Sequence, residues 1–563
     1  MSENSLWSSL FNSTTVTVFE ISQFFLLLIV AVITLIVINY RRRIYIAMVT
    51  LPRDLRIMYG FGKLIWYNRV FQKQNTTVLK LFQQRVAKEP KKIVFYFEDK
   101  AWTVADVEEF SNRVAQVFIA AGYRKGDIVA LFMGNCPEYI CIWLGLAKLG
   151  VITSLINHNL RNQPLSHTLN VVKTKALIFS HELSSAVQEV VSSLDIFLEQ
   201  YQLGGKQPEA SNVKSLNLLL ASASTSQPNV EGPGYMDELL YIYTSGTTGL
   251  PKPALVPHSR CLLVIFSAKC LLQLNPDDII YNPLPLYHTS GGMIGIGPAL
   301  VFGNPVALRT KFSASAYWND CIKYKCTVSM YIGEMCRYIM ATPHKPEDSK
   351  HCIRMMLGNG MRPTIWKGFM ERFKVGQVAE FYGSTEGNAN MINLDSQIGA
   401  VGCIPRCVPR SLLPVDLIRV DPDTNIPIRD KRGLCIRCDT GEPGMLVGLI
   451  SSSNAIRDFH GYVDKKASSR KILHNVFKMG DKAFLTGDLL VMDEYGYIYF
   501  KDRTGDTFRW KGENVSTAEV ESVIINVIGL KDVAVYGVQV NTYSSEPYSG
   551  HSYCHIFSGV TID

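Results

Sequence analysis

Charge is scarce in this sequence, and long runs of one charge sign are missing from it. Charged residues make up 19% of the 563 residues, against 47% hydrophobic residues, with 41 Gly and 25 Pro. This composition is typical of a globular, loop-rich protein and excludes a disordered or fibrous one. The formal net charge of +8 is modest, and part of it is concentrated between Arg41 and Lys73. We interpret that excess as the flank of a membrane segment, and we expect no nucleic-acid partner.

The 13 cysteines lack a pattern that requires disulfides. Most are scattered, many in apolar surroundings, as expected of small buried hydrophobes in a reducing compartment. Two closer pairs, Cys403/Cys407 and Cys435/Cys438, have a spacing that zinc could use. No His accompanies them, and Pro and Arg stand between the sulfurs of the first and second pair. Structural thiols are therefore favoured, with a zinc site as the alternative.

Residues 21–40 contain no charged residue. Twenty helical residues span about 30 Å, the thickness of a bilayer core. Glu20 precedes this run and Arg41–Arg43 follow it, whereas a cleaved signal peptide has its basic residues first. We predict a transmembrane helix at 21–40, with residues 1–20 lumenal or extracellular and the bulk of the chain cytoplasmic.

The alternative for this segment is a buried hydrophobic helix. The sequon at Asn12 agrees with a lumenal N-terminus, and the basic segment 41–74 is predicted to lie near the membrane. The chain lacks a C-terminal S-K-L or K-D-E-L signal. Endoplasmic reticulum, plasma membrane and peroxisome therefore all stay open, as does homo-oligomerisation.

After residue 75, candidate strands alternate with amphipathic helices. The alternation predicts parallel βαβ units, and the length of the chain predicts several subdomains. The predicted strands are 92–97, 127–133, 151–157 and 175–180, and the predicted helices are 103–122 and 137–150. Residues 204–234 are interpreted as a connection.

The stretch YIYTSGTTGLPKPAL, residues 241–255, lacks the spacing of a P-loop. Its hydroxyls, glycines and successive backbone N–H groups nevertheless suit a triphosphate, and Lys252 adds a positive charge. An ordinary Ser/Gly turn is the alternative interpretation.

The longer string TSGTTGLPK resembles the phosphate loop of the adenylate-forming enzymes: acyl-CoA synthetases, luciferases and peptide-synthetase adenylation domains. Further motifs of that superfamily follow in order, namely LPLYHTSGG (284–292), MLGNGMRP (356–363), FYGSTEGN (381–388), TGDLL (486–490) and KDRTGD (501–506). Three strings narrow the resemblance to the fatty acid transport proteins, or very-long-chain acyl-CoA synthetases, over roughly residues 85–540: residues 311–338, residues 505–521, and YTSGTTGLPK with HSR (258–260) following it.

The resemblance implies an α/β adenylate-forming fold. Residues 75–500 would form a large AMP-binding (adenylation) domain of βαβ subdomains, and residues 501–540 part of a small α+β C-terminal domain. It implies ATP-dependent ligation of long- or very-long-chain fatty acids to coenzyme A through an acyl-adenylate, coupled to fatty acid uptake, with Mg²⁺ as cofactor. Luciferase or peptide-synthetase activity is less expected, because neither class carries the anchor.

The resemblance also implies site residues. The catalytic candidates are Lys252, Thr385 and Glu386, and Glu386 would hold Mg²⁺. The ATP- or AMP-binding candidates are Tyr243, Thr244, Ser245, Gly246, Thr247, Thr248, Gly249, Lys252, Gly358, Asn359, Gly360, Tyr382, Gly383, Thr385, Asp488 and Arg503. The acyl pocket would involve His288, Gly291, Gly292, Tyr331, Ile332 and Gly333, with ordinary core packing as the alternative for the last three, and Gly512 would approach coenzyme A.

Two features depart from the family pattern. Pro253 follows Lys252, so the next strand is expected to start later or to lie at a sheet edge. The divergent tail 541–563 contains no Lys or Arg to supply the family's C-terminal catalytic lysine, and an exposed sheet edge is expected at 533–540. These features predict slow adenylation, and they leave open a transport or lipid-binding protein that does not ligate, or a regulatory isoform that pairs with an intact subunit.

Overall fold

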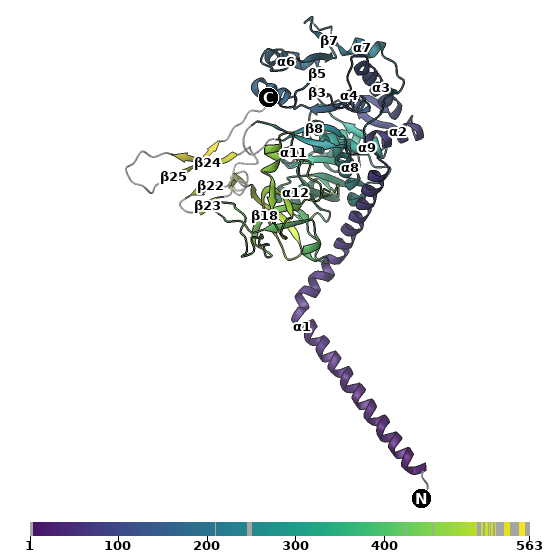
Figure 1. Cartoon of the computed structure of the whole chain (residues 1–563), viewed down its shortest axis with the longest axis vertical. Coiled ribbons are helices and arrows are strands. Elements are labelled where there is room, and N and C mark those ends of the chain that lie inside the picture. Colours follow the sequence, from purple (N-terminus) through teal and green to yellow (C-terminus); the bar gives the residue numbers. More distant parts are fainter. Residues whose placement is uncertain are drawn as a thin grey trace, which may run out of the picture.

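The computed structural model describes residues 4–205, 207–208, 210–244, 250–422, 424–452, 454–503, 508–510, 513–515, 517, 520–521, 524, 534–540 and 551–557. Side chains are described for only part of residues 4–39 and of the residues after 503. Three sheets form the body, and two short hairpins project from it (Figure 1).

A seven-stranded sheet lies at the end of the body farthest from the N-terminus (Figure 1). Its strands are parallel except for the last, which is antiparallel to its neighbour. In spatial order they are β7 (Val213–Ser215), β6 (Glu199–Leu203), β5 (Ala176–Ser180), β3 (Ile128–Phe132), β4 (Ile152–Leu155), β8 (Glu238–Thr244) and β9 (Lys252–Pro257). Its helices are α3 (Val104–Ala120), α4 (Pro137–Lys148), α5 (Asn162–Val171), α6 (Ser184–Val191) and α7 (Leu216–Ser222).

Local signals explain why these elements form where the sequence predicts them. Thr103 caps α3 in a capping box with Asp106, which satisfies backbone N–H groups at the start of the helix. Gly122, just after the helix, has a φ of 80°, a conformation that glycine adopts without strain. The predicted parallel βαβ pattern is confirmed. The predicted connection 204–234 is wrong in part, because it contains β7 and α7.

An eight-stranded sheet forms the centre of the body, with antiparallel strands only at its two edges. In order its strands are β15 (Met391–Asn393), β14 (Gln377–Tyr382), β13 (Met355–Asn359), β12 (Val328–Ile332), β10 (Ile280–Asn282), β11 (Val306–Leu308), β1 (Ile93–Phe97) and β2 (Lys100–Thr103). Its helices are α2 (Val78–Lys88), α8 (His258–Leu272), α9 (Gly297–Val301), α10 (Tyr317–Lys323), α11 (Gly333–Met340) and α12 (Pro363–Phe373). One hydrophobic core extends from this sheet to the seven-stranded sheet.

The third sheet is antiparallel and packs around a separate core. In order it contains β16 (Ala400–Cys403), β21 (Tyr497–Arg503), β20 (Lys482–Met492), β18 (Pro443–Leu449) and β17 (Val415–Ile418), with β19 (Ile472–His474) beside β20 and the short helix α13 (Lys465–Ser469) between β18 and β19 in the chain. The two hairpins are β22 (Phe508–Trp510) with β23 (Glu513–Val515), and β24 (Ala534–Val540) with β25 (His551–Phe557).

Two expectations about strand edges can be compared with these sheets. Pro253 lies in β9, where it pairs with Tyr243 of β8, and β9 is the edge strand of its sheet. The expected edge position is therefore confirmed, whereas the strand does not start later, because β9 begins at Lys252. The expected open edge at 533–540 is wrong on one side, because residues 551–557 of the predicted tail pair with β24.

Both cysteine pairs singled out in the sequence lie in the described residues. Cys403, Cys407, Cys435 and Cys438 are free thiols. Across the described part of the chain, no group of three or more His, Cys, Asp or Glu side chains could hold a metal ion. The zinc alternative therefore finds no support there.

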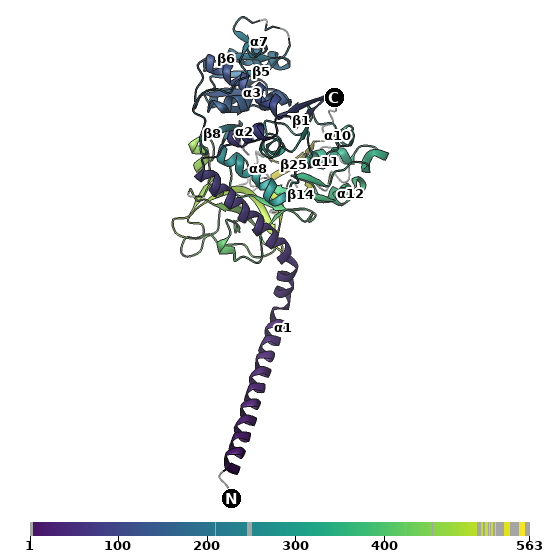
Figure 2. The same cartoon turned by 90° about the vertical axis from the view of Figure 1, so that its right-hand side faces the viewer.

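Helix α1 (Asn4–Lys73) runs along the body beside α8 and then extends away from it (Figure 2). Among helices in the described residues, none combines the length and hydrophobicity that a membrane crossing requires. Most side chains of the predicted transmembrane segment 21–40 lie outside the described residues, so that segment stays a prediction.

Candidate active site

The C-terminal ends of β12, β13 and β14 meet at one edge of the central sheet. Tyr331 pairs with Gly358, and Gly358 pairs with Glu380, so the three strands end side by side. The last residues of these strands and the segments that follow them contain the sequence-predicted residues at 333, 358–360 and 382–386. Ligands of α/β sheets bind outside the carboxyl ends of the strands, so this edge is the candidate site.

The buried side chain of Glu380, on β14, links the ends of β12, β13 and β14 by hydrogen bonds. It is 1% exposed and accepts hydrogen bonds from the Tyr331 hydroxyl and from the backbone N–H groups of Gly360 and Met361, the last at 3.2 Å. Burial raises the pKa of this carboxyl group from 4.5 to about 7. Tyr331 is completely buried, so it supports the turn from within the core, and its place in the acyl pocket stays a prediction.

Two glycines make the turn above Glu380 possible. A Cβ atom on Gly333 would lie 1.6 Å from the Gly360 carbonyl oxygen, and Gly360 has a φ of 80°. The helix α11 therefore starts in direct backbone contact with the turn after β13.

Tyr382, Asp488 and Arg503 form the first polar cluster at this edge. The Tyr382 hydroxyl donates to Asp488, and the Arg503 Nε donates to the other carboxylate oxygen of Asp488 at 2.9 Å. Asp488 and Arg503 face each other across β20 and β21. Burial raises the pKa of the Tyr382 phenol well above its usual value, and the Asp488 charge adds to this. The third sheet thus supplies two of the three residues.

Glu386 forms the second cluster, with two residues that the sequence motifs do not indicate. Its Oε1 accepts from the Tyr462 hydroxyl at 2.8 Å, while Oε2 is buried without a hydrogen-bond partner in the described part of the chain. Arg260, on α8, is 5% exposed and donates to the carbonyl oxygens of Ser384, at 3.2 Å, and Gly387. Burial lowers the pKa of Arg260 to about 10, against the opposing effect of the Glu386 charge.

The motif 284–292 meets the same loop. The Thr289 and Thr385 hydroxyls lie 2.8 Å apart. Gly291 and Gly292 are buried in a π-helical turn, Ser290–Gly295, where a Cβ atom would lie 2.3 Å and 2.0 Å from backbone carbonyl oxygens of 285 and 286. His288 is exposed, with its ring centroid 4.5 Å from that of Tyr287.

The phosphate-loop motif is described only at its two ends. Thr244 and Lys252 pair at the end of the hairpin β8–β9 where the chain passes from one strand to the other. The Tyr243 hydroxyl is buried, donating to the Thr168 carbonyl oxygen at 2.6 Å, with Ser154 Oγ 2.9 Å away. The predicted residues Ser245, Gly246, Thr247, Thr248 and Gly249 lie outside the described residues, as does Gly512. Tyr462 is joined to this hairpin by a β-bridge to Ala254, which brings Glu386 toward β9.

Comparison with known proteins assigns this arrangement to a class. The AMP-binding enzyme family matches residues 82–447. Among solved structures, an anthranilate CoA ligase, AuaEII, in complex with anthranoyl-AMP has a TM-score of 0.69 at 20% identity, covering 82% of this chain and 85% of that one. A Mycobacterium tuberculosis fatty acyl CoA synthetase has a TM-score of 0.61 at 24% identity, covering 86% and 88%. These likenesses show the adenylate-forming α/β fold.

Similar curated sequences point to a more specific family than the solved structures do. Long-chain fatty acid transport protein 1 is 45% identical over 501 residues in Bos taurus, and 45% over 499 residues in Homo sapiens; each match covers 87% of this chain and 77% of the relative. Long-chain fatty acid transport protein 2 of Rattus norvegicus is 40% identical, covering 87% and 79%. The chain belongs to the long-chain fatty acid transport protein family of AMP-binding, adenylate-forming enzymes.

Proposed function

We propose that the chain ligates long- or very-long-chain fatty acids to coenzyme A at the expense of ATP. The observation that carries this proposal is the convergence of the Tyr382–Asp488–Arg503 and Glu386–Tyr462–Arg260 clusters around one loop, residues 382–387, at the strand ends. One cluster has the chemistry to bind a ribose, and the other to organise a polyphosphate.

Asp488 is suited to the ribose. Its carboxylate oxygens can accept hydrogen bonds from two neighbouring hydroxyl groups, and the contacts with Tyr382 and Arg503 fix its orientation. The Tyr382 ring, held by the same hydrogen bond, is the surface proposed to stack on adenine. We propose that Gly358, Asn359, Gly360 and Gly383 border the adenine.

Glu386 fits the Mg²⁺ that the family implies. Its Oε2 is buried and has no hydrogen-bond partner within the described residues, and a hard carboxylate oxygen is the ligand that Mg²⁺ prefers. When bound, the ion would neutralise charge on the phosphate oxygens of ATP. Tyr462 holds the other carboxylate oxygen, so Glu386 would present Oε2 in a fixed direction.

The reaction then has two steps. A fatty carboxylate oxygen attacks the α-phosphorus of ATP, and pyrophosphate leaves. The coenzyme A thiolate next attacks the acyl carbonyl carbon of the adenylate, and AMP leaves. Lys252, Thr385 and the backbone donors of the loop after β8 contribute by alignment and by charge stabilisation as negative charge builds on the phosphate.

The fatty acid class rests on the names of the relatives, which are long-chain fatty acid transport proteins. Ligation supports uptake because the thioester product is charged and bulky, which keeps it inside the cell.

We also propose that residues 21–40 anchor the chain in a membrane with its catalytic part cytoplasmic. The described side chains Phe25–Val30 on α1 are apolar and exposed. Glycosylation of Asn12 in microsomes would test that orientation.

The ligase proposal is tested by acyl-CoA formation from palmitate or a C24 acid, with ATP, Mg²⁺ and coenzyme A. Wild-type chain should form the thioester slowly, as the lack of Lys and Arg in 541–563 predicts, and Glu386→Gln should reduce the rate by a further factor of at least about 100, as losses of groups that stabilise developing charge do. Glu371→Gln is the matched control, because Glu371 is an exposed partner of Lys367 on α12. Fatty acid uptake retained in Glu386→Gln cells would instead support transport without ligation.

A further inference from the structure

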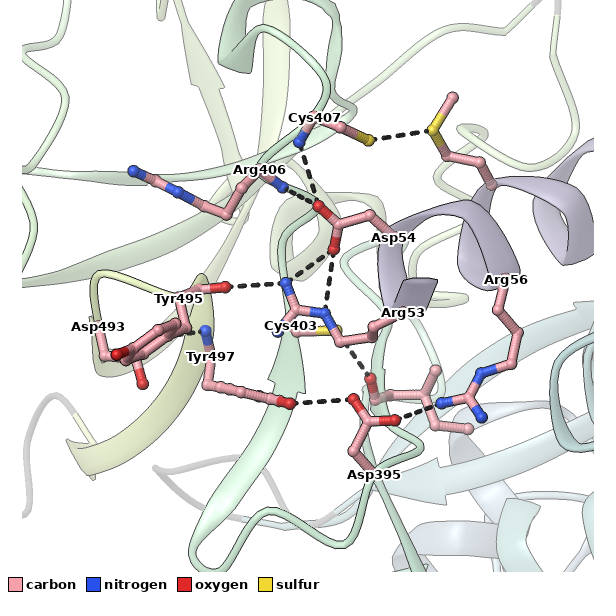
Figure 3. Close-up of polar contacts among 12 residues, drawn as sticks. Arg53, Asp54, Arg56, Asp395, Cys403, Arg406, Cys407, Asp493, Tyr495 and Tyr497 are labelled. Carbon is pink, nitrogen blue, oxygen red and sulfur yellow. Dashed lines mark hydrogen bonds and ion pairs between the residues drawn. The ribbon is translucent and has the colours of Figure 1, made fainter. Parts of the chain in front are cut away.

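Helix α1 makes specific polar contacts with the enzyme body before it extends away. Ile57, Leu64 and Phe71 are buried in the main core. A Cβ atom on Gly60 would lie 2.7 Å from Leu271 and 2.8 Å from the Cys270 carbonyl oxygen, so α1 approaches α8 closely. About two helical turns before Gly60, Arg53 and Asp54 contact the third sheet and the turn after β16 (Figure 3).

Asp54 is fully buried, and each of its two carboxylate oxygens accepts two hydrogen bonds. One oxygen accepts from the backbone N–H groups of Arg406 at 2.6 Å and Cys407 at 3.1 Å. The other accepts from the Arg53 guanidinium at 3.0 Å and 2.7 Å (Figure 3). A buried carboxylate with four donors holds the turn after β16 against α1.

Arg53 also contacts the hairpin formed by β20 and β21. It donates to the Tyr495 carbonyl oxygen at 2.8 Å and lies 4.5 Å from the centroid of the Tyr497 ring. The Tyr497 hydroxyl donates to Asp395 at 2.9 Å, and Arg56 on α1 pairs with the same carboxylate. Asp395 follows β15 of the central sheet. We name Arg53, Asp54, Asp395 and Tyr497 the α1 clamp.

The clamped hairpin has the ribose-binding pair at its other end. Tyr495 lies in its turn and Tyr497 begins β21, which ends at Arg503, opposite Asp488 on β20. Five residues of β21 lie between Tyr497 and Arg503, and the six residue-to-residue steps span about 20 Å. β20 and β21 stay paired from Met492 and Ile498 to Asp488 and Arg503, with one register shift between Leu489 and Leu490. Paired strands of this kind can carry coupling between two sites because they move as one element.

We propose that the α1 clamp positions Asp488 and Arg503 for nucleotide binding through the β20–β21 hairpin. The inference rests on the proposed role of Asp488 at the ribose. It assigns to the membrane-proximal helix a part in the nucleotide site, in addition to any part in attachment. Arg53 and Asp54 are positioning residues, because they contact neither the clusters at the strand ends nor the loop between them.

Two variants of the full chain test the clamp. Asp54→Asn keeps the size of the side chain but turns an amide N–H₂ toward the Arg53 guanidinium. Tyr497→Phe removes the hydroxyl and keeps the ring beneath Arg53, so it is the milder change and carries the test if Asp54→Asn does not fold. Each should weaken ATP binding, measured by calorimetry without fatty acid, by about 3- to 10-fold, with the affinity for palmitate unchanged.

The matched control is Arg42→Gln. Arg42 pairs with Glu494 in the same hairpin turn, but its side chain is 62% exposed, and exposed pairs contribute little. Its ATP affinity should equal that of wild type. Folded Asp54→Asn or Tyr497→Phe chains that bind ATP as tightly as wild type would overturn the proposal.

The route through the hairpin is tested on an Asp488→Asn background. If the clamp acts on Asp488, adding Asp54→Asn or Tyr497→Phe there should change ATP affinity less than about 2-fold, because the coupled effects are not additive. Full additivity would overturn the hairpin route while leaving the proposed function intact. If Asp488→Asn alone bound ATP like wild type, the ribose assignment itself would fail, and the clamp inference with it.

Discussion

Tyr462 is the residue on which the orientation of Glu386 depends most directly, through the 2.8 Å hydrogen bond to Oε1. Tyr462→Phe should lower the rate of acyl-CoA formation about tenfold, since hydrogen bonds to charged groups contribute about 1.5–3 kcal/mol. The apparent affinity for Mg²⁺ should fall with it. Steady-state rates over a Mg²⁺ titration measure both quantities.

Tyr201→Phe is the control for that substitution, because the Tyr201 hydroxyl also donates to a carboxylate at 2.8 Å, that of Glu199, and lies on β6, which supplies no residue to either cluster. An unchanged Mg²⁺ dependence in Tyr462→Phe would contradict the role given to this hydroxyl.

Glu380 makes the stability of the site depend on pH. Its folded pKa of about 7 lies above the ordinary 4.5, so the folded chain binds the extra proton between these values. Stability from this group is present below about pH 4.5 and is lost as pH rises through about 7, by at most about 3 kcal/mol. Glu380→Gln should remove that loss.

The measurement is the melting temperature of wild type and Glu380→Gln at pH 5 and pH 8. The difference between the two proteins should shift in favour of the variant at pH 8. A difference that is the same at both pH values would show that Glu380 ionises normally.

Resemblance to the motifs of the adenylate-forming enzymes predicts Tyr382, Asp488, Arg503 and Glu386, and the structure brings these four to one edge of the central sheet. Arg260 and Tyr462 could not be found that way. Arg260 follows the phosphate loop in HSR, a string that carries no chemistry by itself, and its contact with the loop 384–387 exists only once α8 is buried. Glu380 is likewise defined by three donors, one from β12 and two from the turn after β13.

At the scale of elements, helix and strand periodicity predicts β1, α3, β3, α4, β4 and β5 well, because capping and amphipathic patterns are local. Periodicity did not predict the short elements β7 and α7, because a strand of three residues and a helix of seven residues carry little periodic signal. The pairing of β25 with β24 depends on contacts between separate segments, so the local sequence of neither segment predicts it.

Helix α1 offers a matched pair of glycines two residues apart. Gly60→Ala should destabilise the packing of α1 on α8 by about 1–3 kcal/mol, as overpacking does, because its Cβ meets backbone at 2.8 Å. Gly62→Ala has nothing within 4 Å and should stabilise the helix by up to about 1 kcal/mol. Urea unfolding of both variants checks the sign; equal effects would contradict the close approach of α1 to α8.

At the scale of the whole molecule, the candidate site exists only where all three sheets meet. The central sheet supplies the strand ends, the seven-stranded sheet supplies the hairpin β8–β9, and the third sheet supplies Asp488 and Arg503. Helix α1 contacts both α8 and the third sheet, which ties these parts together from outside. The family resemblance predicts the large domain, whereas the contacts of α1 depend on charges that only the folded chain brings within reach.

The most direct test of acyl-adenylate chemistry is exchange of labelled pyrophosphate into ATP by the full chain without coenzyme A. Wild type should catalyse exchange that depends on palmitate and Mg²⁺, and Asp488→Asn should reduce it at least about tenfold, the cost of a lost hydrogen bond to a charged group. Wild-type chain that binds ATP and palmitate yet gives no palmitate-dependent exchange would contradict the proposed ligase function.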